Sequence, residues 1–213
     1  MKKARATIGD IFEVRTGHGL AYLQYTHHDA FMGNLVRVLP GKYRSRPTSL
    51  DEIVSREEVY FVFCTLDSAV KDGTFQRVAN RPLAAHLTRP PVMRQPGDVS
   101  RDGKVLNWLI GDNLPNQVWR NVRELTSAEL RLSDRMLVSH HTLVEYLESG
   151  WTPERAEEFA EQARNAKAHR EAGVSLKAPV FLGWITHFPI ADSILAYAAK
   201  KPVHPPGAGQ SHP

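Results

Sequence analysis

The sequence predicts an α+β, mainly β fold: a bent antiparallel sheet or a partly open small barrel, with helices towards the C-terminus. Three observations support this class. Apolar and polar residues alternate along the N-terminal part of the chain, the apolar segment 59–65 is typical of a strand covered on both faces, and helical signals gather after residue 127. We expect a β-rich core domain over residues 1–150, a helical and strand appendage packed on it over 151–200, and a disordered tail over 201–213.

Short alternating segments predict an antiparallel meander at the start of the chain. They cover residues 8–14, 20–27 and 34–39. The tripeptide Gly17-His18-Gly19 between the first two is typical of a tight hairpin turn. Residues 49–54, just before the apolar segment, are expected to form one helical turn.

The middle of the chain is expected to hold an edge strand and a loop, followed by a second hairpin. Four prolines exclude a helix interior between residues 72 and 98. The second hairpin is predicted from strands at 105–110 and 117–122, which flank the turn residues 111–116.

Two helical segments are predicted at 127–132 and 140–149 from their terminal residues. Ser139 is suited to cap the start of the second one, and Gly150 is suited to follow its end. These helices close the β-rich part of the chain.

A longer helix is predicted from Pro153, with Thr152 as its N-cap and Gly173 after its end. Its apolar face is thin, which favours light packing on a surface. A strand at 180–185 and a short helix at 190–199 follow.

Composition and charge are those of an ordinary soluble protein. The net charge is only +4 although the sequence pI is about 9.3, and mean hydropathy is −0.36. The start MKKARATIGD has no apolar stretch typical of a secretory signal, and no apolar run is long enough to span a membrane. The single cysteine, Cys64, fits a reducing compartment and lies among apolar residues where a buried structural role is expected. We therefore expect a cytoplasmic protein with no membrane association.

His27, His28 and Asp29 are the first group that suggests chemistry. On a regular strand His27 and Asp29 share one face while His28 points to the other. His27 and Asp29 are therefore candidate metal ligands, but two ligands do not make a site. A strand end that enters a turn accounts for the same residues, so no metal and no other cofactor is predicted.

His140 and His141 form a second histidine pair. Neighbouring residues of a helix point about 100° apart, and so do not share the face that an i, i+4 pair shares. Together with Asp134 and Ser139 they suggest a catalytic triad, but a helix that starts with Ser139 as its cap explains the same residues. No catalytic residue is predicted.

A basic and aromatic segment offers a candidate binding loop. It consists of Lys42, Tyr43, Arg44 and Arg46, and it interleaves an aromatic ring with cations as single-strand nucleic-acid binders do. An acidic protein surface is an equally suitable partner for such a loop.

Several pieces of the sequence resemble immunity protein family 26, from bacterial polymorphic-toxin systems. They are IGDIFEV and LAYLQY, then NWLIGD, VWRNV and MLVSHHTLVEYLESG. The resemblance covers roughly residues 5–150, while the proline- and arginine-rich segment 80–96 and residues 151–213 have no counterpart in it. It implies a compact, mainly β, non-catalytic protein that neutralises a cognate protein toxin by stoichiometric binding.

The usual enzyme motifs are missing from the sequence, which agrees with a binding protein. There is no glycine-rich phosphate loop, no GxSxG, no HExxH and no CxxC. The alternatives are a nucleic-acid-binding β-barrel that uses the basic loop and a metal-dependent hydrolase built around His27 and Asp29.

Overall fold

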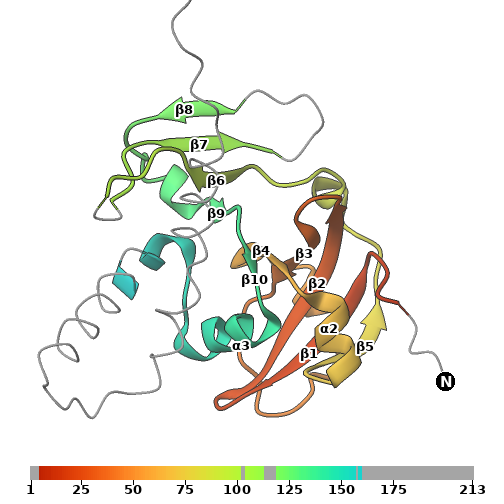
Figure 1. Ribbon diagram of the computed structural model, residues 1–213. Helices are drawn as coiled ribbons and strands as arrows, with labels where there is room; N and C mark the ends of the chain where they lie inside the picture. The colour runs from red at the N-terminus through yellow and green to blue at the C-terminus, as the bar shows by residue number, and fades with distance from the viewer. Residues whose placement is uncertain (1–4, 102–103, 113–118, 157, 160–213) are drawn as a thin grey trace, which may run out of the picture. The chain divides into compact units, whose positions relative to one another are not determined.

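The computed structural model of the chain describes residues 5–101, 104–112, 119–156 and 158–159. Within these residues the strands form two sheets, accompanied by a few short helices (Figure 1). The predicted α+β, mainly β class is thus confirmed. Neither of the two sheets in this part of the chain closes into a barrel.

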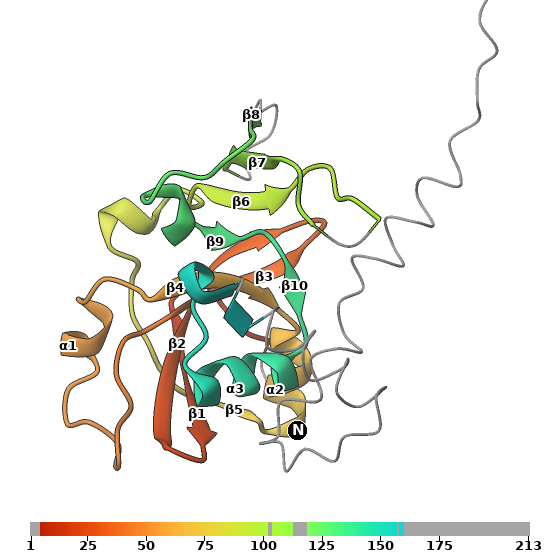
Figure 2. The ribbon, with the colours of Figure 1, turned by 90° about the vertical axis from the view of Figure 1, so that its left-hand side faces the viewer.

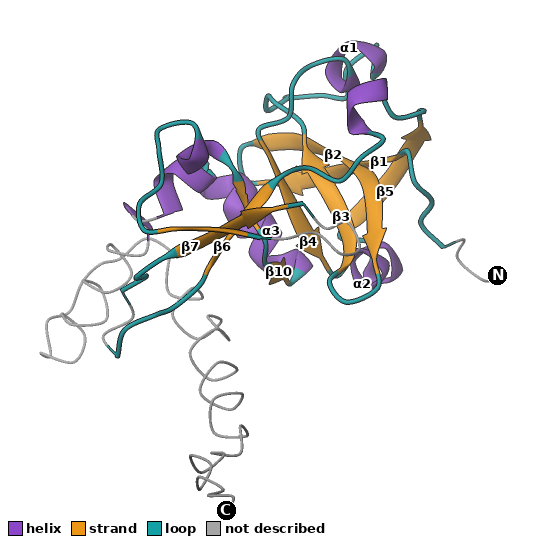
Figure 3. Ribbon diagram, turned by 90° about the horizontal axis from the view of Figure 1, so that it is seen from above, coloured by secondary structure: helices purple, strands orange, loops and turns teal. Residues whose placement is uncertain are grey.

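The larger sheet has six strands in the order β10-β4-β3-β2-β1-β5. Its strands are β1 Asp10–Thr16, β2 Gly19–Asp29, β3 Gly33–Val38, β4 Tyr60–Cys64, β5 Phe75–Asn80 and β10 Leu137–Val138. Neighbours are antiparallel except β4 and β10, which are parallel. Figure 3 shows that the long strands of this sheet are curved, in agreement with the predicted bent sheet.

The predicted N-terminal meander is confirmed, and its first turn brings the candidate binding loop to the sheet. The turn between β1 and β2 falls at Gly17 and His18, and Gly19 then pairs with Thr16. Gly19 has φ of +119°, and a Cβ there would lie 2.6 Å from the carbonyl oxygen of Tyr43. Only glycine therefore allows the backbone of Tyr43 to pair with Leu20, through two hydrogen bonds of 2.7 and 2.9 Å.

The smaller sheet has the order β8-β7-β6-β9. Its strands are β6 Met93–Pro96, β7 Trp108–Gly111, β8 Arg120–Val122 and β9 Ser133–Asp134. The hairpin predicted for this region is confirmed as β7 and β8, although β7 starts later than expected and residues 113–118 of its turn and second strand lie outside the described residues. The edge strand and loop expected between residues 72 and 98 contain two strands, β5 at the edge of the larger sheet and β6 inside the smaller one.

A short segment of chain connects the two sheets. Strand β9 pairs in parallel with β6 of the smaller sheet, and β10, which follows it directly, pairs in parallel with β4 of the larger one. The Ser133 hydroxyl accepts a hydrogen bond of 2.8 Å from the backbone N–H of Phe61. The two sheets also share apolar contacts, because Met93 of β6 packs with Leu35 and Phe63.

The described helices are short. They are α1 Asp51–Val54, α2 Leu66–Asp72 and α3 His140–Ser149, together with the 3-10 turns η1 Ala85–Leu87, η2 Glu129–Arg131 and η3 Pro153–Arg155. Helix α1 and helix α3 were predicted, whereas α2 was not. Thr152 was predicted to cap a helix with its side chain, but its hydroxyl is buried and makes no capping hydrogen bond.

Helix α3 has the ends that its sequence predicts. The Ser139 hydroxyl accepts a hydrogen bond of 3.0 Å from the backbone N–H of Thr142, and Gly150 adopts φ of +70° just after the last turn. Leu143 and Tyr146 on the inner face are buried. Helices α2 and α3 lie side by side (Figures 1 and 2).

Replacing Ser139 with alanine is expected to lower the free energy of unfolding by about 1 kcal/mol, because the N–H of Thr142 loses its acceptor. Urea denaturation measures the change. Ser149 is the control, since it lies at the opposite end of the same helix and its alanine variant removes only a long 3.3 Å bond to the Tyr146 carbonyl. Equal losses in the two variants would contradict the capping role.

Most of the predicted C-terminal elements lie outside the described residues. These are the helix beyond residue 159, the strand 180–185, the helix 190–199 and the tail 201–213. Trp151 at the start of this region is buried and stacks on Tyr146 at a centroid distance of 4.4 Å. In the part of the chain that the structure describes, no helix has the length and apolarity to cross a membrane.

Candidate functional site

The turn between β2 and β3 presents an exposed aromatic side chain. Phe31 at this turn is 94% exposed, whereas the next residue, Met32, turns inward and packs against Leu35 and its apolar neighbours. The Asp29 carboxylate accepts hydrogen bonds from the backbone N–H groups of Phe31 and Met32, at 2.8 and 2.7 Å. The turn is thus held from within its own sequence, and the ring of Phe31 is displayed on a fixed backbone.

The strands on either side of this turn are joined by polar side chains as well as by their backbones. The side-chain oxygen of Asn34 accepts a hydrogen bond of 2.8 Å from the Tyr25 hydroxyl and lies 3.0 Å from Nδ1 of His28. These contacts cross from β2 to β3 close to the turn. We refer to residues 28–34, with Phe31 at their centre, as the hairpin tip.

The structure gives His27 and Asp29 different roles. The Asp29 carboxylate is used by the turn, as the strand-end interpretation predicts. A β-bulge lies between Tyr25 and His27, but the pairing with β3 is regular from His27 to Asp29, as the prediction assumed. Burial lowers the pKa of His27, and a backbone contact with Thr88 opposes the effect. In the described residues these two side chains belong to no group of three metal-ligand candidates.

The four residues of the predicted basic loop have separate environments. Lys42 donates to the backbone carbonyl of Glu148 at 3.2 Å, and the Tyr43 ring packs edge-on against Tyr22. Arg46 forms a two-pronged ion pair with Glu13, at 2.8 and 3.2 Å. Arg44 is exposed. Nucleic-acid binding through this loop stays a prediction, and Arg46 could serve it only by leaving Glu13.

Glu13 is a buried carboxylate whose charge is compensated locally. The Arg46 guanidinium holds its pKa below the ordinary value of 4.5, burial opposes this, and the Tyr22 hydroxyl, which donates at 2.9 Å, lowers it further. Burial and the neighbouring carboxylate also raise the pKa of Tyr22. Arg46 therefore ties the basic loop to the first strand of the sheet.

Replacing Arg46 with glutamine is expected to destabilise the protein near neutral pH and to have little effect in acid. A carboxyl group with a lowered pKa contributes stability above its unfolded pKa of 4.5, and this contribution is lost as pH falls through the lowered folded value. Thermal melts of wild type and variant from about pH 3 to pH 8 measure the difference. Arg44→Gln is the matched control. A difference in melting temperature between wild type and Arg46→Gln that stays the same in acid would contradict the ion pair between Arg46 and Glu13.

The catalytic triad considered for Asp134, Ser139 and the two histidines is not assembled. Ser139 is engaged as the cap of α3, and Asp134 forms an ion pair of 2.7 Å with Arg94. The prediction that favoured a helix cap over a triad is thus consistent with the structure. His140 and His141, by contrast, lie beside Asp72 at the end of α2, a neighbour that the sequence did not reveal.

Cys64 has the buried position that was expected. It is the last residue of β4 and is buried, and burial raises the pKa of its thiol to about 12. Such a burial and pKa are those of a structural cysteine, because a reactive thiolate needs an electropositive and partly open setting.

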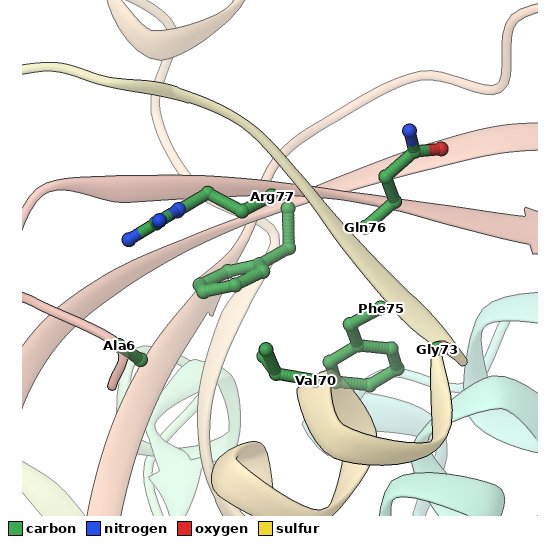
Figure 4. Close-up of a pocket in the computed structure, with 7 residues that line it drawn as sticks. Ala6, Val70, Gly73, Phe75, Gln76 and Arg77 are labelled. Carbon is green, nitrogen blue, oxygen red and sulfur yellow. The ribbon is translucent and has the colours of Figure 1, made fainter. Parts of the chain in front are cut away.

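A pocket lies between α2 and β5 (Figure 4). Its volume is about 460 Å³, and Val70 and Phe75 contribute apolar surface from the two elements. Arg77 is the one charged residue among the described residues that line it, and its guanidinium donates to Asp10 at 3.3 Å. The pocket therefore offers mainly apolar contact and one arginine that already has a partner.

Comparison with known proteins gives no family and no function for these features. The chain matches no protein-family model, no curated protein and no solved structure. The function is therefore argued from the chain's own residues and from the resemblance described above.

Proposed function

We propose that the chain is a non-catalytic binding protein that neutralises a cognate protein toxin by stoichiometric binding, as its resemblance to immunity protein family 26 implies. We propose the cytoplasm as its compartment, because a single cysteine fits a reducing environment. Such a function needs a surface that is complementary to the partner and needs no reacting group. The proposal rests on one observation above the others, the exposed Phe31 at the hairpin tip.

At 94% exposure, Phe31 is the most exposed of the large apolar side chains in the described residues, although phenylalanine is among the residue types most often buried. Removing such a ring from water is worth about 1.5–3 kcal/mol. Binding energy in protein interfaces is concentrated in a few side chains, with aromatic rings prominent among those that fill a pocket on the partner. Phe31 has the chemistry of such an anchor.

The fixed backbone of the tip favours binding through Phe31. Ordering a loop on binding costs free energy, and a loop that is ordered beforehand avoids most of this cost. The Asp29 carboxylate and the Asn34 side chain hold the tip without a partner. The cognate toxin is therefore expected to meet a preformed protrusion and to receive it in an apolar pocket.

Co-expression of the chain with each candidate toxin gene found next to its own gene tests the proposal. The wild-type chain is expected to restore growth to cells that express the toxin. Phe31→Ser is expected to weaken the complex about 30-fold or more and to protect poorly, because truncating an anchor residue costs about 2 kcal/mol or more.

Leu106→Ser is the matched control, since Leu106 is 53% exposed and lies outside the hairpin tip. It is expected to protect as well as the wild type. Failure of the wild-type chain to bind any product of the adjacent genes would contradict the proposed function. Equal protection by wild type and Phe31→Ser would contradict the role of the tip.

A further inference from the structure

We propose that Asp72, His140 and His141 form a binding site for a divalent transition-metal ion, with Zn²⁺ as the best match. Each residue offers one ligand atom, and the three atoms lie within 4.8 Å of one another. Two imidazole nitrogens and one carboxylate oxygen are a ligand set that Zn²⁺ binds readily, and that nickel and cobalt also accept. Metal binding at these residues is independent of partner binding at the hairpin tip.

The fold brings the three ligands together from two helices. Asp72 is the last residue of α2, and the histidines are the first two residues of α3 beside it (Figures 1 and 2). The two imidazole rings have centroids only 4.0 Å apart and are inclined by 43°. The expectation that neighbouring helical residues point apart is therefore wrong for these side chains, which converge at the first turn of the helix.

His140 is held in the orientation that a metal ligand needs. Its Nδ1 lies 2.8 Å from the Thr65 hydroxyl oxygen, which also accepts a 3.0 Å hydrogen bond from the backbone N–H of His140. Nε2 is left to face Asp72. Metal-bound histidines usually have their second ring nitrogen fixed in this way by a neighbouring oxygen, so Thr65 is the positioning residue of the site.

The contact between His140 and Asp72 is a close ion-pair contact. Nε2 of His140 lies 2.7 Å from Oδ2 of Asp72, within ion-pair distance. The same Nε2 is buried and makes no hydrogen bond of good geometry in the described residues. A metal ion between the two atoms would use the nitrogen lone pair and the carboxylate together.

Small side-chain movements complete the geometry. Ligand atoms 2.0–2.1 Å from a tetrahedral zinc ion lie about 3.3 Å apart. His141 is exposed and the Asp72 side chain is 43% exposed, so both can move by the ångström or so that is required while His140 stays in place. Oδ1 of Asp72 accepts hydrogen bonds from the backbone and hydroxyl of Thr74, which leaves Oδ2 for the ion.

Three protein ligands leave the fourth position of a tetrahedral ion to solvent. Because His141 and Asp72 are exposed, water or an anion can reach this position. We therefore infer an exchangeable site that joins α2 to α3 and keeps one open coordination position.

A simple ion pair between His140 and Asp72 is the competing explanation for this cluster. The two explanations make different predictions for the removal of His141. An ion pair needs no third residue, whereas a metal site loses one of its three protein ligands when His141 is removed. The test is a calorimetric titration with Zn²⁺. The full-length chain is prepared without a histidine tag and is first stripped of metal with a chelator. The visible absorption of bound Co²⁺ reports the coordination geometry in parallel.

One Zn²⁺ per chain is expected at this site, with the affinity reduced at least about tenfold in both His141→Ala and Asp72→Asn. The controls are Asp67→Asn on the same helix and His86→Ala, both exposed and outside the cluster, and both are expected to bind as the wild type does. Absence of Zn²⁺, Ni²⁺ and Co²⁺ binding would overturn the proposal. So would an affinity that is unchanged in His141→Ala.

Discussion

Replacing Arg37 with methionine is expected to lower the free energy of unfolding by about 3–5 kcal/mol. Arg37 lies on β3 in the middle of the larger sheet and is 2% exposed. Its guanidinium donates to the Gln24 side chain at 2.9 Å and to the Val54 carbonyl at 2.6 Å, and it lies 3.6 Å from the Glu58 carboxylate. Methionine fills much of the same volume but leaves these acceptors without a donor.

Burial lowers the pKa of Arg37, and Glu58 opposes this shift. The guanidinium nevertheless stays charged near neutrality, because an arginine in a protein does not lose its proton. Arg37→Lys keeps the charge but lacks the planar fork, so it is expected to lose stability as well, to a smaller extent. Urea denaturation measures both variants, with the exposed Arg44→Met as a control that should change stability by less than about 0.5 kcal/mol. A loss below about 1 kcal/mol in Arg37→Met would show that Arg37 does not hold the sheet to the segment around α1.

Replacing Arg94 with methionine is expected to have a similar cost, about 3–5 kcal/mol, in a different part of the molecule. Arg94 lies on β6, is 2% exposed and donates to Asp134 at 2.7 Å. It also donates to the backbone carbonyls of Leu130 and Pro153, at 2.9 and 2.6 Å, and stacks over Trp108. One side chain thus connects the smaller sheet to both η2 and η3.

The pH dependence of the Arg94 variant provides an independent check. Burial raises the pKa of Asp134 and Arg94 opposes this, so removing Arg94 raises the pKa further. A carboxyl group whose pKa is higher in the folded than in the unfolded state makes the protein less stable as pH rises from the unfolded pKa to the folded pKa. Protonation of the group restores this stability. The penalty of Arg94→Met is therefore expected to be smaller at about pH 5 than at about pH 7.5. Hydrogen exchange should show the earliest loss of protection in β6 and β9, and a uniform loss over both sheets would contradict a local role.

The strands β1 to β4 of the larger sheet could be predicted because their signals are local. Alternation along β1 to β3 and the apolar run of β4 mark these segments as strands, although consecutive residues of β1 to β3 are buried on both faces. The caps of α3 are equally local, and Ser139 and Gly150 were identified from residue type alone. By contrast, α2 is a single short helix between two strands, and its seven residues are too few to show a helical period.

The candidate sites depend on contacts between distant segments, which local patterns do not record. Asp72 meets the histidines of α3 only because α2 and α3 pack together. Phe31 and Met32 are both apolar, and nothing in their order shows that Met32 turns inward while Phe31 faces solvent. Arg37 and Arg94 belong to the residue type that is most often exposed, so their burial could not be anticipated.

The most direct test of the central proposal is a calorimetric titration of the purified full-length chain with each candidate toxin domain encoded by the genes next to its own. The proposal predicts a complex of one chain with one toxin domain, and an affinity that falls about 30-fold or more in Phe31→Ser but stays unchanged in Leu106→Ser. A toxin domain that releases no heat and forms no complex with the wild-type chain would contradict the proposed function.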